Sequence, residues 1–291
     1  MDDLPPKPEW LNRVAIIGVG LLGGSVGHAL RRRGVQVVGY SRRESTAQTA
    51  VRSGAIDEGH TTIGEACRGA DVVVICSPVD KIATLAAQAC EVLDDQTLIT
   101  DVGSTKALIV DEIESKSTRA FRQFVAAHPI AGSEKTGVEN AMPDLFDGKC
   151  VILTPNEQTD ATMLARAKQF WRQTGGSLVL MSPAEHDERL AAVSHVPHLI
   201  SSLLATFPDD PSLPLVGSGW RDMTRVAAGD PEMWTAICNH NRPAILSQLD
   251  RFIEELKLVK TRLSDENVEV MYRWLERAKE RKQSTESTES G

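Results

Sequence analysis

Short apolar runs alternate with helical stretches along the first part of the chain. Runs with strand composition occupy residues 14–17, 35–40, 71–76, 97–101, 124–127, 150–153 and 177–181. Segments with helical composition lie between them, among them residues 24–33, 105–114 and 160–174. This alternation predicts an α/β fold with a doubly wound, mostly parallel sheet and helices on both faces. We expect the run at 177–181 to close that sheet.

The pattern changes near residue 182, after which helical spacing continues without a convincing strand. The helical segments are 184–207 (interrupted near Pro197), 232–238, 243–263 and 265–282. One of them carries an apolar stripe of period 3.6, formed by Ile245, Leu249, Phe252, Ile253, Leu256 and Val259. We therefore predict an α/β domain over 12–182 and an all-helical domain over 183–282. The Ser/Thr/Glu-rich end, 283–291, is expected to be disordered.

A glycine-rich loop directly follows the first predicted strand and opens the first helix. Its sequence, Gly18-Val19-Gly20-Leu21-Leu22-Gly23, fits the G-x-G-x-x-G pattern in the context that a dinucleotide site requires. The three glycines would permit a tight turn, a close approach to a pyrophosphate, and close packing of helix on strand. An ordinary glycine-rich turn is the alternative. We predict a Rossmann-type domain whose cofactor-binding residues include Gly18, Gly20, Leu21, Leu22, Gly23, Ser77 and Pro78.

The end of the second predicted strand indicates which dinucleotide binds. NAD sites usually place Asp or Glu there, to bond the ribose hydroxyls. This chain has Ser41, Arg42 and Arg43 instead. A hydroxyl and guanidinium groups bind a 2′-phosphate through charge-assisted hydrogen bonds, whereas a carboxylate would repel it. We predict NADP as the preferred cofactor, with NAD possible; alternatively, the arginines belong to a solvated loop.

Candidate catalytic residues follow two later strands. The segments 101–106 and 128–134 both lie at predicted carboxyl ends, where open α/β sheets bind their ligands. His128 could act as a general base, because the pKa of histidine lies near neutral pH. A structural role in a loop is its alternative.

Two further groups lie in the helical half. His195 and His198 are spaced to share one face of a helix. Because no suitable third ligand accompanies them, we predict no metal site. Arg221 and Arg225 could each clamp a substrate carboxylate with the guanidinium fork, or could be surface charges.

Composition narrows the class of protein. A net charge of −8 disfavours sequence-independent binding to nucleic acid or to an anionic membrane surface. The longest apolar runs are far shorter than the ~20 residues that span a bilayer. Five cysteines without a Cys-x-x-Cys pair, and a start without a secretory signal, suggest a reducing compartment. We therefore expect a cytoplasmic protein.

Taken together, these motifs resemble the prephenate/arogenate (cyclohexadienyl) dehydrogenase family of tyrosine biosynthesis. The matching segments run in family order over roughly residues 12–260: the glycine loop 18–23, 101–106, 128–132, 194–198, 222–225 and Trp234. His-Pro-Ile-Ala-Gly at 128–132 and Ser-His-Val-Pro-His at 194–198 are more specific than the glycine loop.

The resemblance implies an NAD(P)-dependent oxidoreductase that oxidises and decarboxylates a cyclohexadiene. By matching position, His128 would polarise or deprotonate the 4-hydroxyl, and Ser104 would orient the hydroxyl, the histidine or the nicotinamide amide. Arg225 would bind a substrate carboxylate. His195 and His198 would line the pocket, and Glu134 would help to gate it. We expect prephenate as the substrate, giving 4-hydroxyphenylpyruvate, with arogenate as the alternative.

Two alternative functions and the oligomeric state also have to be considered. A β-hydroxyacid dehydrogenase or imine reductase would share the architecture, but the Lys-x-x-x-Asn of the former is missing from the sequence. A non-catalytic NADP sensor would bind dinucleotide without turnover. The apolar stripe, with Val268, Met271, Trp274 and Leu275, exceeds what a small bundle covers, and predicts a homodimer through the helical domain.

Overall fold

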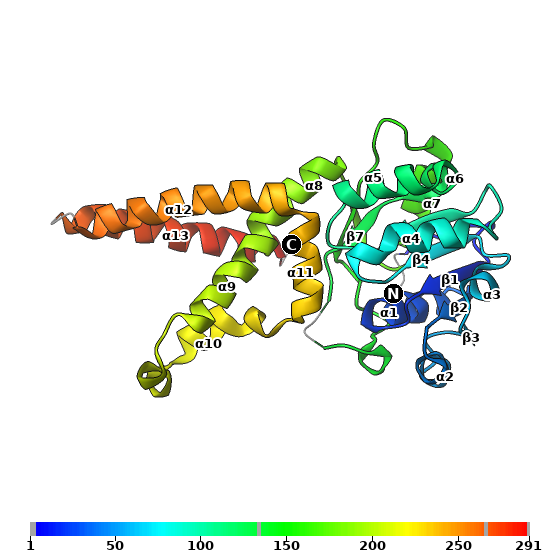
Figure 1. Ribbon diagram of the computed structural model, residues 1–291, viewed down its shortest axis with the longest axis horizontal. Helices are drawn as coiled ribbons and strands as arrows, with labels where there is room; N and C mark the ends of the chain where they lie inside the picture. Colours follow the sequence, from blue (N-terminus) through cyan, green and yellow to red (C-terminus); the bar gives the residue numbers. More distant parts are fainter. Residues whose placement is uncertain (1–3, 133–134, 265–266, 290–291) are drawn as a thin grey trace. The chain divides into compact units, whose positions relative to one another are not determined.

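Figure 1 shows the computed structural model of the chain, which describes residues 4–132, 135–264 and 267–289. The chain forms two compact units, Met1–Ala244 and Ile245–Gly291. The larger unit holds both sheets and most of the helices, and the smaller one holds a pair of long helices.

A six-stranded parallel sheet with the order β3-β2-β1-β4-β5-β6 forms the centre of the larger unit. The strands are β1 (Arg13–Ile17), β2 (Gln36–Tyr40), β3 (Glu58–His60), β4 (Val72–Ile75), β5 (Leu98–Asp101) and β6 (Phe124–Val125). The predicted doubly wound, mostly parallel fold is confirmed. Only β3 escaped prediction, because its sequence Glu-Gly-His has neither an apolar run nor β-branched residues.

Helices cover both faces of this sheet. They are α1 (Leu21–Arg31), α2 (Glu44–Arg52), α3 (Ile63–Cys67), α4 (Val79–Cys90), α5 (Ala107–Lys116), α6 (Thr118–Gln123) and α7 (Ala161–Arg172). Alternate residues of β1 point to opposite faces. Val14 and Ile16 join a core with α1 and α7, whereas Ala15 and Ile17 join a second core with α4 and α5. The sheet therefore has one apolar core on each side.

A separate three-stranded sheet follows the central one. β8 (Cys150–Leu153) pairs antiparallel with β7 (Ala127–Pro129) and parallel with β9 (Ser177–Leu180). The expectation that the run at 177–181 closes the main sheet is therefore wrong. The predicted strand 124–127 also divides between the two sheets, since the Asp101 carboxylate accepts the Ala127 N–H at 2.9 Å and takes the place of a ladder bond.

The helical part of the larger unit begins directly after β9. It contains α8 (Pro183–Leu190), η2 (Ala191–His195), α9 (Val196–Thr206), η3 (Asp210–Leu215), α10 (Ser218–Thr224), η4 (Arg225–Ala228) and α11 (Pro231–His240). The predicted interruption near Pro197 is a π-helical turn, η2. Proline lacks the N–H of a regular helix and crowds the preceding turn, and a wider turn just before it relieves that crowding.

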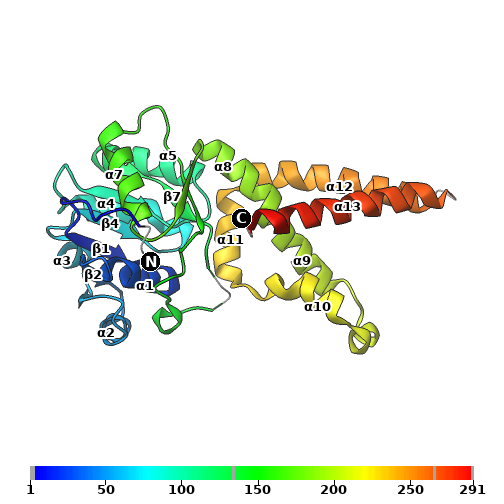
Figure 2. The same ribbon diagram turned by 180° about the vertical axis from the view of Figure 1, so that it is seen from behind.

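The smaller unit contains α12 (Arg242–Ser264) from Ile245 onward and α13 (Val268–Glu289), which lie side by side in both views (Figures 1 and 2). The guanidinium of Arg262 lies 5.9 Å above the Trp274 ring and links the two helices. Helix α13 continues through most of the segment 283–291. In the described residues, no helix is long and apolar enough to cross a membrane.

The change from strands to helices occurs at the predicted residue, 182–183. The compact units divide later, at Ala244, so that α8 to α11 belong to the same unit as the sheets. The domain boundaries at 182 and 282 therefore remain predictions.

We expect Gly23→Ala to lower the free energy of unfolding by about 1–3 kcal/mol, because the helix has no room to accept a methyl group. A Cβ at Gly23 would lie 2.1 Å from the Gly18 carbonyl oxygen and 2.9 Å from Ile16 Cγ2. Gly20→Ala is the matched control: a Cβ there meets nothing within 4 Å, and we expect a loss below about 1 kcal/mol. Urea unfolding of both variants measures the difference; equal losses would contradict the packing argument.

Candidate functional site

The glycine loop has the shape of a phosphate cradle. Gly18 adopts φ +101°, and a Cβ on it would lie 2.2 Å from the Cys76 carbonyl oxygen, so only glycine fits between β1 and β4. Gly20 is the N-cap of α1, and nothing lies within 4 Å of the position its Cβ would occupy. The first turn of α1 contains no acidic residue. The loop therefore leaves an open, electropositive helix N-terminus, which suits a pyrophosphate.

The loop lies at the point where the strand order reverses. From β1 the chain crosses to β2 on one side and later to β4 on the other, and such a switch point is where open α/β sheets bind ligands. Ser77 and Pro78 connect β4 to α4 at the same edge. The Ser77 hydroxyl lies 3.2 Å from the Cβ position of Gly18. The residues present thus fit a dinucleotide.

The segment after β2 presents basic groups at this edge. The Ser41 backbone N–H bonds the His60 carbonyl oxygen at 3.1 Å, which ties this segment to the end of β3. Arg42 and Arg43 are exposed. Within the described ranges, neither guanidinium has an ion pair or a hydrogen bond, so both are free to meet an anionic ligand.

His128, on β7, belongs to a chain of hydrogen bonds that runs into the helical half. Its Nδ1 lies 2.8 Å from His186 Nε2, and the two ring centroids are 5.1 Å apart. On the other side of its ring, His186 Nδ1 lies 2.8 Å from Asp187 Oδ1. His128 is partly exposed, whereas His186 and Asp187 on α8 are buried. The chain therefore leads from an accessible imidazole to a buried carboxylate.

Asp187 also binds the beginning of α5. Its two carboxylate oxygens accept the backbone N–H groups of Lys106 at 2.8 Å and Ala107 at 2.9 Å. The Lys106 ammonium forms an ion pair with Asp101, and both side chains are fully buried. Asp101 in addition accepts the Gly103 N–H at 2.9 Å. Two carboxylates thus fix the loop 102–106, which contains Ser104.

A second histidine group lies beside this chain. The Asn241 amide nitrogen lies 2.7 Å from the Asp187 carbonyl oxygen and 3.0 Å from His195 Nδ1. The His198 ring stacks on Trp234, with centroids 3.4 Å apart and an interplanar angle of 10°. Gly229 permits this stack, because a Cβ there would lie 2.6 Å from Trp234 Nε1. His195 is therefore held by the buried Asn241, and His198 by the partly buried Trp234.

Burial keeps this cluster of histidines neutral near pH 7. Burial, and then the charges of His186, Lys106 and His195, hold the pKa of His128 well below its usual 6.5. Burial also lowers the pKa of His186, although the hydrogen bond to Asp187 opposes the shift. Burial lowers the pKa of His195 to about 4, against the opposing effects of Asp187 and the Ser104 backbone.

The structure brings His128, His195 and His198 into one cluster with the loop of Ser104. It does not bring Arg225 into that cluster. Arg225 begins η4, is exposed, and has no polar partner in the described part of the chain. Glu134 lies outside the described residues. In the described ranges, no three His, Cys, Asp or Glu side chains are placed to hold a metal ion.

Five buried polar residues of the cluster were missed as site residues: Asp101, Lys106, His186, Asp187 and Asn241. Asp101 and Lys106 belong to the candidate catalytic segment 101–106, but the sequence does not show that their side chains form a buried ion pair. His186 and Asp187 lie in the mostly polar stretch 184–189, whose composition is typical of the solvent-exposed face of a helix. Their adjacency, a histidine beside an acid at the start of the helical half, was the one available signal.

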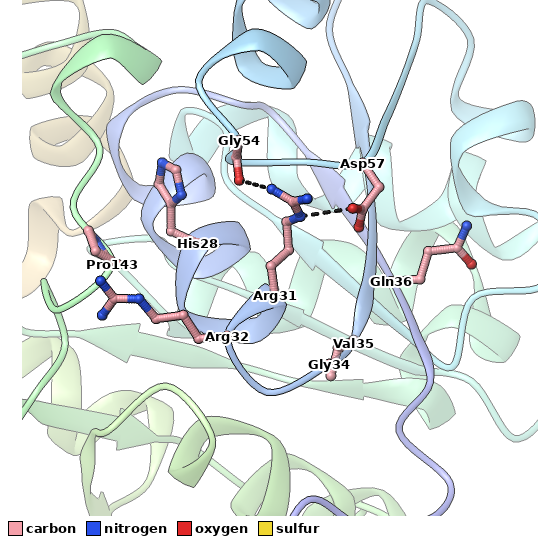
Figure 3. Close-up of a pocket in the computed structure, with 9 residues that line it drawn as sticks. All are labelled: His28, Arg31, Arg32, Gly34, Val35, Gln36, Gly54, Asp57 and Pro143. Carbon is pink, nitrogen blue, oxygen red and sulfur yellow. Dashed lines mark hydrogen bonds and ion pairs between the residues drawn. The ribbon is translucent and has the colours of Figure 1, made fainter.

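A hollow of about 750 Å³ lies elsewhere, at the amino ends of the strands (Figure 3). His28, Arg31 and Arg32 line it from the last turns of α1. The Arg31 guanidinium is occupied by Asp57, at 2.9 Å, and by the Gly54 carbonyl oxygen. This hollow is at the edge of the sheet opposite to the glycine loop and is separate from the histidine cluster.

We expect the folded chain to lose stability as the pH falls through 6.5 towards 4. Unfolded histidines take up protons near pH 6.5. The folded pKa values of His128, His186 and His195 lie lower, so in this window the unfolded chain binds more protons and is favoured. Urea midpoints at pH 7.5, 6 and 5 measure the decline, which should be shallower in His195→Asn. A midpoint independent of pH would contradict it.

Two family models match this chain, and they meet where the strands give way to helices. The family model described as "Prephenate dehydrogenase, nucleotide-binding domain" matches residues 26–180, and the model described as "Prephenate dehydrogenase, dimerization domain" matches residues 182–277. Prephenate dehydrogenase of Bacillus subtilis is 33% identical over 281 residues, which are 94% of this chain and 76% of that protein.

Solved structures agree over most of the chain. Prephenate dehydrogenase from A. aeolicus, in complex with hydroxyphenyl propionate and NAD+, has a TM-score of 0.87 at 33% identity and covers 94% of this chain and 98% of that one. Arogenate dehydrogenase from Synechocystis has a TM-score of 0.81 at 28% identity, covering 94% and 99%. The resemblance inferred from the motifs is confirmed: the chain belongs to the prephenate dehydrogenase family.

Proposed function

We propose that this chain is an NADP-preferring prephenate dehydrogenase, which converts prephenate to 4-hydroxyphenylpyruvate and CO₂. The observation that carries the proposal is the neutral His128, partly exposed on β7 and hydrogen-bonded at 2.8 Å to a buried His186–Asp187 pair. An imidazole of this kind can take the proton of a substrate hydroxyl. The family relationship supplies the substrate class.

The bound dinucleotide would supply the hydride acceptor. His128 accepts the 4-hydroxyl proton as the hydride leaves the same ring carbon and a C=O bond forms. The C–C bond to the ring carboxylate then breaks, CO₂ departs, and the electron pair enters the ring, which becomes aromatic. His128 can return its proton to the phenolate oxygen, so the histidine is regenerated. Overall, the substrate loses one hydride and one CO₂.

The other site residues have supporting roles in this proposal. Ser104, held in the loop between Asp101 and Lys106, orients the reacting hydroxyl, the histidine or the nicotinamide amide. His195 and His198 line the pocket, and the stack on Trp234 fixes the orientation of His198. Arg225, exposed on η4, binds a substrate carboxylate. Glu134 is proposed to gate the pocket.

Cofactor preference rests on the segment after β2. Gly18, Gly20, Leu21, Leu22 and Gly23, with Ser77 and Pro78, would hold the pyrophosphate and the nicotinamide half. Ser41, Arg42 and Arg43 would bind the 2′-phosphate, since both guanidinium groups are exposed and Glu44 is the first acidic residue after β2. A relative binds NAD+, so NAD remains the alternative cofactor.

We further propose a homodimer formed through the helical domain, 183–282. The second family model is described as a dimerization domain. The smaller unit exposes a series of large apolar side chains, at Leu246, Ile253, Leu256, Leu258, Leu263, Val268, Tyr272 and Leu275. Burial of such a surface in a partner would remove it from water. The five free cysteines fit a reducing compartment, and we place the enzyme in the cytoplasm.

His128→Asn should lower kcat for prephenate by about 10²–10⁴-fold, because the substrate proton loses its acceptor. The Kd of the dinucleotide should hardly change. The matched control is His28→Asn, which alters another histidine whose pKa is lowered by burial, on α1 and away from the cluster. Reduced-dinucleotide formation, followed spectrophotometrically, gives kcat. A normal kcat in His128→Asn would refute the proposed function.

Arg42→Ala should lower the ratio of kcat/KM with NADP to that with NAD by about 10–100-fold, as expected for a lost charge-assisted hydrogen bond. Arg52→Ala removes a basic side chain from the end of α2 and should leave the ratio unchanged. An unchanged ratio in Arg42→Ala would assign the arginines to a solvated loop.

Arg225→Ala should raise the KM for prephenate by about 10-fold or more, with a smaller change in the dinucleotide KM. Arg221→Ala, one helical turn earlier, provides the comparison. If only Arg221→Ala raises the substrate KM, the carboxylate clamp lies there instead.

A further inference from the structure

The Asp187 carboxylate determines where His186 carries its proton. Its oxygens already accept the N–H groups of Lys106 and Ala107, and a carboxylate has only acceptors to offer. The ring nitrogen of His186 that faces it, Nδ1 at 2.8 Å, must therefore be the donor. In a neutral imidazole the other nitrogen then has a free lone pair.

The tautomer of His186 in turn determines the tautomer of His128. His186 Nε2, which bears the lone pair, faces His128 Nδ1 at 2.8 Å, so His128 donates from Nδ1. Its Nε2 is then left without a proton. That nitrogen is the one that does not take part in the chain, and it is the atom available to accept a substrate proton.

A second route from Asp187 gives His195 the opposite tautomer. The Asp187 carbonyl oxygen can only accept, so the Asn241 group facing it at 2.7 Å must be the NH₂ end of the amide. The second hydrogen of this NH₂ points to His195 Nδ1 at 3.0 Å, which must then accept. Neutral His195 therefore carries its proton on Nε2, an atom that is buried.

We propose that Asp187 sets the tautomers of both histidines in opposite senses, so that His128 presents an acceptor and His195 a donor at Nε2. His186, Asp187 and Asn241 are positioning residues: they act through the two imidazoles and contact none of the reacting atoms. For His128, this deepens the proposed function, since the base named there works only in this tautomer. It also assigns the reacting atom as Nε2.

The arrangement also accommodates the charge that catalysis creates. When His128 Nε2 takes the substrate proton, its Nδ1 proton can pass along the existing hydrogen bond to His186 Nε2, whose nitrogen lies 2.8 Å from His128 Nδ1. His186 is then an imidazolium whose Nδ1–H faces the Asp187 carboxylate, and His128 is neutral again. Return of the proton along the same path restores both rings.

Long-range ¹H–¹⁵N spectra of the full-length protein with labelled imidazole rings test the tautomers directly. We expect His128 with a protonated Nδ1 and a bare Nε2, and His195 with the reverse pattern. The signals are assigned from their loss in His128→Asn and His195→Asn. A bare Nδ1 on His128, or the same tautomer on both rings, would overturn the inference. This readout requires no turnover, so it stands apart from the choice of substrate.

Asp187→Asn tests the cause. Its amide can turn an NH₂ group towards His186, which would reverse the His186 and His128 tautomers, and kcat should fall about 10²–10⁴-fold with KM and dinucleotide Kd nearly unchanged. Asp160→Asn is the matched control, because Asp160 likewise accepts two N–H groups at a helix start, at 2.8 and 3.0 Å, but contacts no histidine. Wild-type tautomers and kcat in Asp187→Asn would refute the role of Asp187. If Asp187→Asn fails to fold, the wild-type spectrum still decides the tautomers.

Discussion

The Asp187 carboxylate is the interaction on which the site depends, because it joins α8 to α5 and also binds a ring of the histidine chain. It lies on α8, accepts both N–H groups at the beginning of α5, and holds the buried ring of His186. Each buried N–H left without an acceptor would cost about 1–3 kcal/mol, so the carboxylate cannot be removed without disturbing the helix start. The catalytic geometry and the attachment of α8 to α5 are therefore one structure.

The buried ion pair between Lys106 and Asp101 also positions residues of the site. The Lys106–Asp101 pair is fully buried, and desolvation makes such pairs a poor source of net stability. Their value here is geometric: Asp101 accepts the N–H groups of Gly103 and Ala127, at 2.9 Å each, and so holds the Ser104 loop and turns the chain out of the main sheet towards His128. The positive charge of Lys106 also helps to keep the pKa of His128 low. A neutral base thus results from the surrounding fold.

The sequence predicted what depends on local pattern, and missed what depends on tertiary contact. Strand–helix alternation and the glycine loop predicted the Rossmann-type part, and His128 was recognised from its place after a strand. The short polar strand β3 has no apolar signal. The separate sheet of β7, β8 and β9 begins at Ala127, whose N–H is bound by the Asp101 carboxylate, and such a side-chain contact is not visible in the sequence. His186 and Asp187 on α8 are brought together with Asn241 at the end of α11, and no spacing in the sequence reveals that.

A double-mutant cycle tests most directly whether Asp187 acts through His128. Values of kcat/KM for prephenate are needed for the wild type, His128→Asn, Asp187→Asn and the double variant. If Asp187 serves only to present the Nε2 lone pair of His128, its replacement has nothing left to impair once His128 is gone. The account predicts that the double variant is as slow as His128→Asn alone. Losses that multiply in the double variant would contradict it, because Asp187 would then contribute independently of His128.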